Sequence, residues 1–244
     1  RALTGARWSP LPELSVPAVS GARCLTRENG VHVWQAALDV SVARLAALYA
    51  HLMPSEVARA ERYRFEAPRR RFVAARGLLR EILGGYLNLP PARMQFQTNA
   101  WGKPLLSQPQ EALQFNVAHT SDLLLVAVTA DRAVGIDVET VRPVENLNAL
   151  VARTFSSRER AAFRILPPSQ QLEAFYVTWT RKEAYMKARG LGFHLPLGAF
   201  DVTVVPGAPP QVLADRHTPS EEDDWTLCNI FVASRYRVSL GVHK

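Results

Sequence analysis

The 244-residue sequence predicts an α+β protein built from two similar halves. Two observations lead to this prediction. Apolar residues switch between helical and strand spacing along the chain. In each half, short helices are followed by one long helix and then by strands. The order of elements repeats, although the residues show no repeat strong enough to prove duplication. We expect the halves to meet near residues 130–134.

The first half combines strands with three helices. The second helix opens at Pro54, because proline is favoured in the first turn of a helix. The third and longest helix has apolar residues at helical spacing, among them Phe72, Leu79 and Leu83. In chain order, the predicted elements are a strand at 31–34, helices at 39–51, 54–66 and 69–87, a strand at 94–97, a turn at 101–104 and a strand at 113–117.

The second half follows the same order. Residues 123–129 and 134–138 are predicted to form a β-hairpin across the turn 130–133. The long helix is expected to end near Gly190, because glycine readily adopts the left-handed conformation that closes a helix. The predicted helices cover 145–154, 156–166 and 169–189, and the predicted strands cover 200–205, 210–214, 226–232 and 236–242.

These predicted elements divide the chain into three segments. Residues 1–30 are rich in proline and glycine and are expected to form an irregular arm. Residues 31–133 form the N-terminal half, and residues 134–244 form the C-terminal half. Within the latter, residues 206–224 are polar and proline-rich, so we expect a surface loop there.

Composition narrows the class of protein. The hydrophobic content of 48% is that of a folded chain, and no apolar run is long enough to span a membrane. The first residues lack the pattern of a signal peptide. Cys24 and Cys228 form no recognisable motif. We therefore expect a cytoplasmic protein that is not bound to membrane.

The net charge of +7 favours anionic partners. Arginines are dense between Arg59 and Arg80. For most of them a solvated helix face is the simpler interpretation, although one or two could bind a phosphate. A nucleic-acid-binding protein is the competing class, but the segment lacks the interleaved aromatic residues of a single-strand platform. We therefore do not expect nucleic acid as the partner.

Two carboxylates share one face of a predicted strand. Because side chains alternate along a strand, Asp137 and Glu139 point away from the face that carries Val134, Ile136 and Val138. Two neighbouring carboxylates repel each other unless a cation lies between them, and Mg²⁺ accepts such ligands together with phosphate oxygens. The alternative is a half-exposed strand whose acids face water.

A third carboxylate lies on the long helix. Glu183 follows Trp179 by four residues and falls at the edge of the helix's apolar stripe. An acid in such a position is costly unless it is paired or bound to a metal. A plain surface ion pair between Glu183 and Lys187 is the simpler alternative, but it does not explain why Glu183 lies toward the stripe.

Three further cationic residues complete the candidate set. His119 falls at the end of a predicted strand, where loops form sites. Lys103 lies in a rigid Gly-Lys-Pro turn. Arg71 opens the first long helix, near a helix N-terminus that itself favours anions. Each of these signals is weak when taken alone.

Taken together, two motifs resemble those of the 4′-phosphopantetheinyl transferases of the large, Sfp-type class. The motifs are Gly135-Ile136-Asp137-Val138-Glu139 and Trp179-Thr180-Arg181-Lys182-Glu183-Ala184-Tyr185-Met186-Lys187. The similarity covers about residues 31 to 205. It implies a pseudo-dimer of two α+β halves, each with helices packed on a small, mainly antiparallel sheet. Coenzyme A would lie in the cleft between the halves.

The resemblance also implies roles for individual residues. Asp137, Glu139 and Glu183 would bind Mg²⁺, and Trp179 would pack beneath the site. Lys187 and Lys182 would be catalytic residues that contact phosphates. Glu183 is our first choice for the base that accepts the serine proton, because its helix position is the most desolvated of the three carboxylates and burial raises a carboxylate's pKa. A role as metal ligand alone is the alternative. Glu159 matches a further acidic position near the metal. The residues expected to hold coenzyme A are Arg71, Lys103, His119, Arg59, Thr120, Lys182 and Lys187, with Lys103 at the adenine end.

The activity implied is the Mg²⁺-dependent transfer of 4′-phosphopantetheine from coenzyme A to a serine of an acyl or peptidyl carrier protein. Adenosine 3′,5′-bisphosphate would be released. The partner would be an acidic helical domain, and the enzyme would act as a monomer. One departure from the family pattern is Ala118, where a serine is common. A non-catalytic homologue that binds carrier proteins remains a second possibility.

Overall fold

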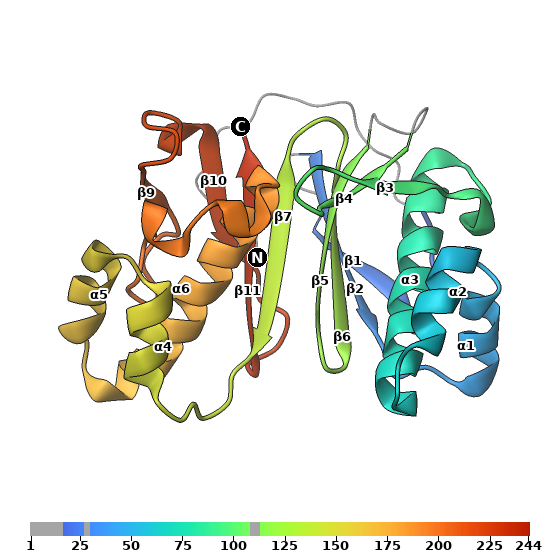
Figure 1. Ribbon diagram of the computed structural model, residues 1–244, viewed down its shortest axis with the longest axis horizontal. Helices are drawn as coiled ribbons and strands as arrows, with labels where there is room; N and C mark the ends of the chain where they lie inside the picture. The colour runs from blue at the N-terminus through green and yellow to red at the C-terminus, as the bar shows by residue number, and fades with distance from the viewer. Residues whose placement is uncertain (1–16, 27–29, 108–112) are drawn as a thin grey trace.

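The computed structural model describes residues 17–26, 30–107 and 113–244. Within them, two helical groups flank two β-sheets (Figure 1). The N-terminal helices are α1 (Val42–Tyr49), α2 (Pro54–Glu61) and α3 (Glu66–Leu87). The C-terminal helices are α4 (Leu147–Thr154), α5 (Ser157–Arg164) and α6 (Pro168–Arg189). The α+β class and the two-half arrangement predicted from the sequence are confirmed.

Each half has its own main sheet. The four-stranded sheet has the order β1-β2-β6-β5 and consists of β1 (Ala22–Thr26), β2 (Val31–Ala37), β6 (Leu123–Thr129) and β5 (Gln114–Thr120), all antiparallel. The three-stranded sheet has the order β10-β11-β7 and consists of β10 (Trp225–Asn229), β11 (Tyr236–His243) and β7 (Val134–Thr140). Two small ribbons pair β3 (Phe96–Thr98) with β4 (Pro104–Leu106) and β8 (Phe200–Val202) with β9 (Val212–Asp215).

The central strands are buried on both faces. In β6, Leu124, Val126 and Val128 pack toward α3, while Leu125 and Ala127 pack toward the other sheet. The second cluster joins the two sheets, because it also contains Ile136, Val138 and Leu240 from β7 and β11. The result is a helix–sheet–sheet–helix arrangement, and it explains why residues 123–129 read as a continuous apolar run.

Two sequence-based predictions about the strands are wrong. Residues 123–129 and 134–138 do not form a hairpin, because β6 already pairs with β2 on one edge and β5 on the other. The turn 130–133 instead carries the chain into the second sheet, where β7 pairs with β11. Residues 22–26, expected in an irregular arm, form β1 at the edge of the first sheet. Residues 1–16 and 27–29 of that arm lie outside the described residues.

Side chains, rather than a backbone ladder, bridge the neighbouring strands β5 and β7. The Ile136 N–H donates to Asn116 Oδ1 at 2.9 Å, and the hydroxyls of Thr120 and Thr140 are 2.9 Å apart. Both pairs are twenty residues apart in sequence, so the two strands run in the same direction. This seam between the halves lies at the centre of the molecule (Figure 1).

The long helix α6 lies directly on β7, and glycine makes this contact possible. A Cβ built at Gly135 would lie 2.1 Å from Ala184 O and 2.2 Å from Ala188 N. The helix therefore covers the strand face that carries Asp137 and Glu139. From the sequence alone, exposure of this face to water had remained an alternative. Helix α6 ends where expected, with Gly190 at φ +66°.

Replacing Gly135 with alanine should destabilise the protein, because the methyl group must displace backbone atoms of α6. We expect a loss of about 3 kcal/mol in the free energy of unfolding, measured with urea. Gly198→Ala is the matched control, since a Cβ at Gly198 meets nothing within 4 Å. Equal stabilities of the two variants would contradict the proposed close packing.

Candidate active site

Two adjoining cavities lie along β5, at the seam between the halves. The first has a volume of about 530 Å³ and is lined mainly by α3 and the end of β5, with Arg59 from α2. The second has a volume of about 310 Å³ and is lined by the turn before β4, by β5 and by the C-terminal part of α6. Pro104 and Val117 line both cavities, so the two adjoin at these residues.

The larger cavity brings together four residues singled out from the sequence: Arg59, Arg71, His119 and Thr120. The Arg59 guanidinium lies 5.2 Å from the ring centre of Phe72. Burial and the nearby Lys187 ammonium lower the pKa of His119, so its imidazole is neutral at pH 7 and can donate one hydrogen bond. A third arginine, Arg76, also lines the cavity but is paired with Glu56. The cavity thus presents the guanidinium groups of Arg59 and Arg71 and a neutral imidazole, which suits an anion.

The smaller cavity is lined by Lys103, Glu183 and Lys187, together with Asn116 and Met186. Lys103, expected at the adenine end of the coenzyme, therefore shares a cavity with the candidate catalytic residues. Its ammonium donates to Val134 O at 2.9 Å and to Ala188 O at 3.3 Å, so it ties the first half to β7 and α6. Burial lowers the pKa of Lys103 to about 8.

The three carboxylates act on one another beside this cavity. Burial raises the pKa of Asp137, Glu139 and Glu183, and Asp137 raises the pKa of the other two further. Lys187 counteracts this effect, since its ammonium donates to Asp137 Oδ1 at 2.6 Å. The second oxygen, Asp137 Oδ2, is buried and has no partner among the described residues. Glu139 Oε1 accepts a hydrogen bond from Trp179 Nε1 at 3.2 Å.

Neighbouring carboxylates repel one another, and a cation placed between them offsets this repulsion. In the described part of the chain, no three histidine, cysteine or acidic side chains converge into a preformed metal site. Mg²⁺ does not require such a cage, because it commonly takes one or two carboxylates and completes its shell with water and phosphate oxygens. The unpartnered Asp137 oxygen and the all-oxygen donor set fit this ion.

The position of Lys182 differs from what we expected from the sequence. We expected it to contact phosphate, but its side chain is fully buried. Its ammonium donates to both oxygens of Glu159 and to Phe200 O, each at 2.8 Å. A lysine ammonium has three donors, so none remains for a ligand. Glu159, expected near the metal, belongs to the same buried pair and also accepts from the Ser156 and Val202 N–H groups.

The sequence interpretation gave no role to one residue of the smaller cavity, Asn116. It precedes Ala118 and His119 on β5, and its amide oxygen accepts a hydrogen bond from Ile136 N–H, which links the two halves. Ala118, where the family commonly has serine, is buried between the sheets. Thr120 lines the larger cavity, although its hydroxyl is already within hydrogen-bonding distance of Thr140.

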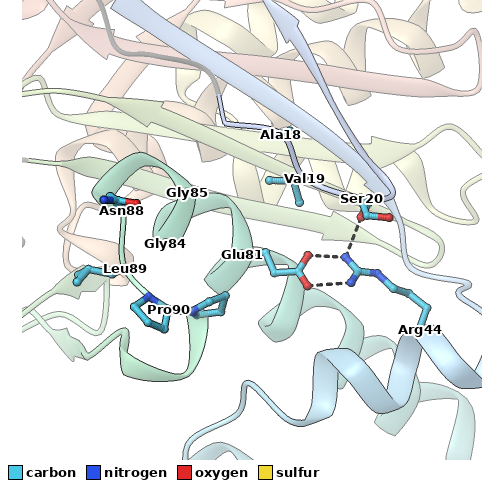
Figure 2. Close-up of a pocket in the computed structure, with 11 residues that line it drawn as sticks. Ala18, Val19, Ser20, Arg44, Glu81, Gly84, Gly85, Asn88, Leu89 and Pro90 are labelled. Atoms are coloured by element: carbon cyan, nitrogen blue, oxygen red, sulfur yellow. Dashed lines mark hydrogen bonds and ion pairs between the residues drawn. The ribbon is translucent and has the colours of Figure 1, made fainter.

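A third cavity, of about 560 Å³, lies beside the C-terminal half of α3 (Figure 2). None of the predicted site residues lines it. Arg44 and Glu81 form an ion pair across it, and Arg44 also donates to Ser20 O at 2.8 Å. In this third cavity, Arg44 and Glu81 are already paired with each other, and the cavity lies away from the carboxylate cluster. We therefore take the seam as the candidate active site.

No helix in the described part of the chain is long and apolar enough to cross a membrane.

Comparison with protein families adds an independent finding. Residues 133–240 match the model described as the 4′-phosphopantetheinyl transferase superfamily, and residues 34–131 match the one described as 4′-phosphopantetheinyl transferase, N-terminal. The two matches meet at the turn between the sheets.

Several curated proteins are similar to this chain. The 4′-phosphopantetheinyl transferase HetI of Nostoc sp. is 41% identical over 181 residues, which are 73% of this chain and 76% of that protein. The 4′-phosphopantetheinyl transferase psf-1 of Bacillus pumilus is 34% identical over 59% of this chain and 60% of its own length. The L-aminoadipate-semialdehyde dehydrogenase-phosphopantetheinyl transferase of Xenopus laevis is 28% identical over 78% of this chain and 68% of its own length.

The buried lysine gives a pH prediction. Since the pKa of Lys103 is lowered to about 8, the unfolded chain holds this proton between about pH 8 and the ordinary value of 10.5, while the folded chain has lost it. Stability should therefore rise with pH in this window, by at most about 1.4 kcal/mol per pH unit. Urea unfolding at several pH values should show this rise relative to Lys103→Met. Parallel curves for the two proteins would contradict the assignment.

Proposed function

The chain belongs to the 4′-phosphopantetheinyl transferase superfamily, and on that premise we propose how its seam transfers phosphopantetheine. A serine hydroxyl of a carrier protein attacks the β-phosphorus of coenzyme A. The bond from that phosphorus to the bridging oxygen breaks, and adenosine 3′,5′-bisphosphate leaves. The observation that supports this best is that a cavity lined by Arg59, Arg71 and His119 adjoins a second cavity beside three carboxylates.

We place the 3′-phosphate of coenzyme A in the larger cavity. Arg71 and Arg59 supply positive charge, and neutral His119 supplies one hydrogen-bond donor. Thr120 lies beside them. The pyrophosphate then extends toward Lys187 and Glu183 in the smaller cavity. Lys103 supports this arrangement by holding the two walls of the seam together.

Asp137, Glu139 and Glu183 are the residues that would hold Mg²⁺. When bound, this ion supplies charge stabilisation to the pyrophosphate oxygens. Lys187 pairs with Asp137 and also donates to Ile136 O at 3.3 Å, so the third donor of its ammonium is available to a phosphate oxygen. Lys182 has no such freedom, so Lys187 is the lysine of this motif that we assign to the reaction.

Glu183 is our candidate for the base that accepts the serine proton. It lines the smaller cavity, and burial together with two neighbouring carboxylates raises its pKa. A raised pKa makes a carboxylate a better proton acceptor near neutral pH. The side chains of Asp137 and Glu139 serve mainly as ligands in this scheme.

The partner is an acyl or peptidyl carrier protein. Its acidic surface complements a chain with a net charge of +7. The proposed site lies wholly within one chain, so a monomer suffices for the reaction. Cys24 and Cys228 form no recognisable motif, in line with a protein of the reducing cytoplasm.

The direct test is mass spectrometry of an apo carrier protein after incubation with coenzyme A, Mg²⁺ and this enzyme. We expect a mass gain of one phosphopantetheine group, which EDTA should prevent. A carrier whose acceptor serine is replaced by alanine is the control. Unchanged mass across a panel of fatty-acid, polyketide and peptide-synthetase carriers would refute the proposal.

Substitution of Arg71 tests the placement of the 3′-phosphate. Arg71→Ala should weaken coenzyme A binding by about 1.5–3 kcal/mol, the usual contribution of a hydrogen bond to a charged group. Binding of dephospho-coenzyme A, measured by the same titration calorimetry, should hardly change because this ligand lacks the group. Arg69→Ala is the control, since Arg69 is exposed on the same helix and does not line the cavity. Equal losses for both ligands would show that Arg71 binds another part of the coenzyme.

Substitution of Glu183 separates its two possible roles. Glu183→Gln keeps the shape of the side chain but removes its charge and basicity. If Glu183 is the base, single-turnover transfer should slow by about 10²–10⁴ while Mn²⁺ affinity, read by electron paramagnetic resonance, stays near that of the wild type. A loss that excess metal ion restores would identify Glu183 as a ligand instead.

A further inference from the structure

Glu139 has a cation as its direct neighbour in the sheet. In the register of β7 and β11, Glu139 lies opposite Arg237. Side chains at directly opposed positions of an antiparallel pair project from the same face, with Cβ atoms about 4.5–5.5 Å apart. Arg237 is long enough to reach the Glu139 carboxylate from there, and such a cross-strand ion pair would be the default outcome.

The structure shows a different arrangement. The Arg237 guanidinium forms a two-bond ion pair with Glu173, on α6, through its Nε and Nη2 atoms. Its Nη1 donates to Ser234 O and Tyr236 O, each at 2.7 Å. These four bonds turn the guanidinium toward the end of the β10–β11 hairpin. Among the described residues, Glu139 instead accepts a hydrogen bond from the Trp179 indole N–H, which is a neutral donor.

The consequence for Glu139 is electrostatic. The cations that lower its pKa are Lys187 and Arg142, and burial and Asp137 outweigh them. An arginine paired directly to this carboxylate would occupy both of its oxygens, because the guanidinium fork matches a carboxylate in two bonds. A divalent cation would then have to displace that arginine before it could bind.

We infer that Glu173 is a positioning residue for the carboxylate cluster: by holding Arg237 it keeps the guanidinium away from Glu139 and leaves Glu139 available to a divalent cation. This inference rests on the proposed metal site. Glu173 touches neither the cavities nor the other carboxylates; it acts through Arg237 alone.

The variants needed are Glu173→Leu, Arg237→Met and the double variant. Leucine removes both acceptors at Glu173 and retains a high helix propensity, while methionine keeps the alkyl stem of Arg237 but not its charge. Binding of Mn²⁺ to the full chain is measured by electron paramagnetic resonance without coenzyme A. Urea unfolding of each variant gives its stability separately from metal affinity.

We expect Glu173→Leu to weaken Mn²⁺ binding about 10-fold, within the range seen when a residue supporting a metal ligand is lost. Arg237→Met should bind Mn²⁺ about as the wild type does, and the double variant should recover that affinity because no arginine remains to compete. A purely structural role of the pair would instead lower stability in all three variants without this recovery. Loss of affinity in the double variant equal to that in Glu173→Leu would overturn the inference.

Glu139→Gln distinguishes this failure from failure of the metal site itself. If wild type and Glu139→Gln bind Mn²⁺ equally, the cation is not held by Glu139, and the proposed site is wrong. If Glu139→Gln loses affinity while Glu173→Leu matches the wild type, the metal site stands and the positioning role of Glu173 is refuted.

Discussion

The contact between α6 and β7 is the constraint on which the rest of the molecule depends. It requires the absence of a side chain at Gly135, because helix backbone atoms occupy the place of a Cβ there. This approach covers Asp137 and Glu139 with the helix that carries Glu183 and Lys187. A strand face that would otherwise meet water becomes the floor of a partly buried charged site. Burial then raises the pKa of all three carboxylates, which is the physical basis of their proposed chemistry.

The two lysines of one helical motif illustrate how orientation decides function. Lys182 and Lys187 are five residues apart on α6, so they project from different faces of the helix. Lys182 is enclosed with Glu159 and fixes the helix against α5 and β8. Lys187 points to the seam and pairs with Asp137. A fully buried ion pair costs much desolvation energy, and the backbone bonds to Glu159 and from Lys182 offset part of it.

Side-chain hydrogen bonds and the apolar cluster between the sheets hold the seam together. Side chains such as Asn116 and Lys103 join the halves where a continuous backbone ladder would close the space between β5 and β7. The cavities are therefore a consequence of how the halves meet. An elongated ligand with charges at two places, such as coenzyme A, suits a site whose cations are distributed along this seam.

The sequence by itself determined the class of fold, the two long helices with their C-terminal ends and the family, because helix periodicity, capping residues and short motifs are local properties. The first long helix begins at Glu66, three residues before its predicted start, so Arg71 does not open it. The sequence also indicated Asp137, Glu139, Glu183 and Lys187 as a group. Only the tertiary structure decided which strands pair. The hairpin predicted for residues 123–138 fails because β6 pairs on one edge with β5, the strand directly before it, and on the other with β2, which is distant in sequence. Three further features depend on contacts between distant segments, which no local pattern encodes. They are the burial of Lys182, the hydrogen bonds of Lys103 across the seam and the ion pair of Arg237 with Glu173.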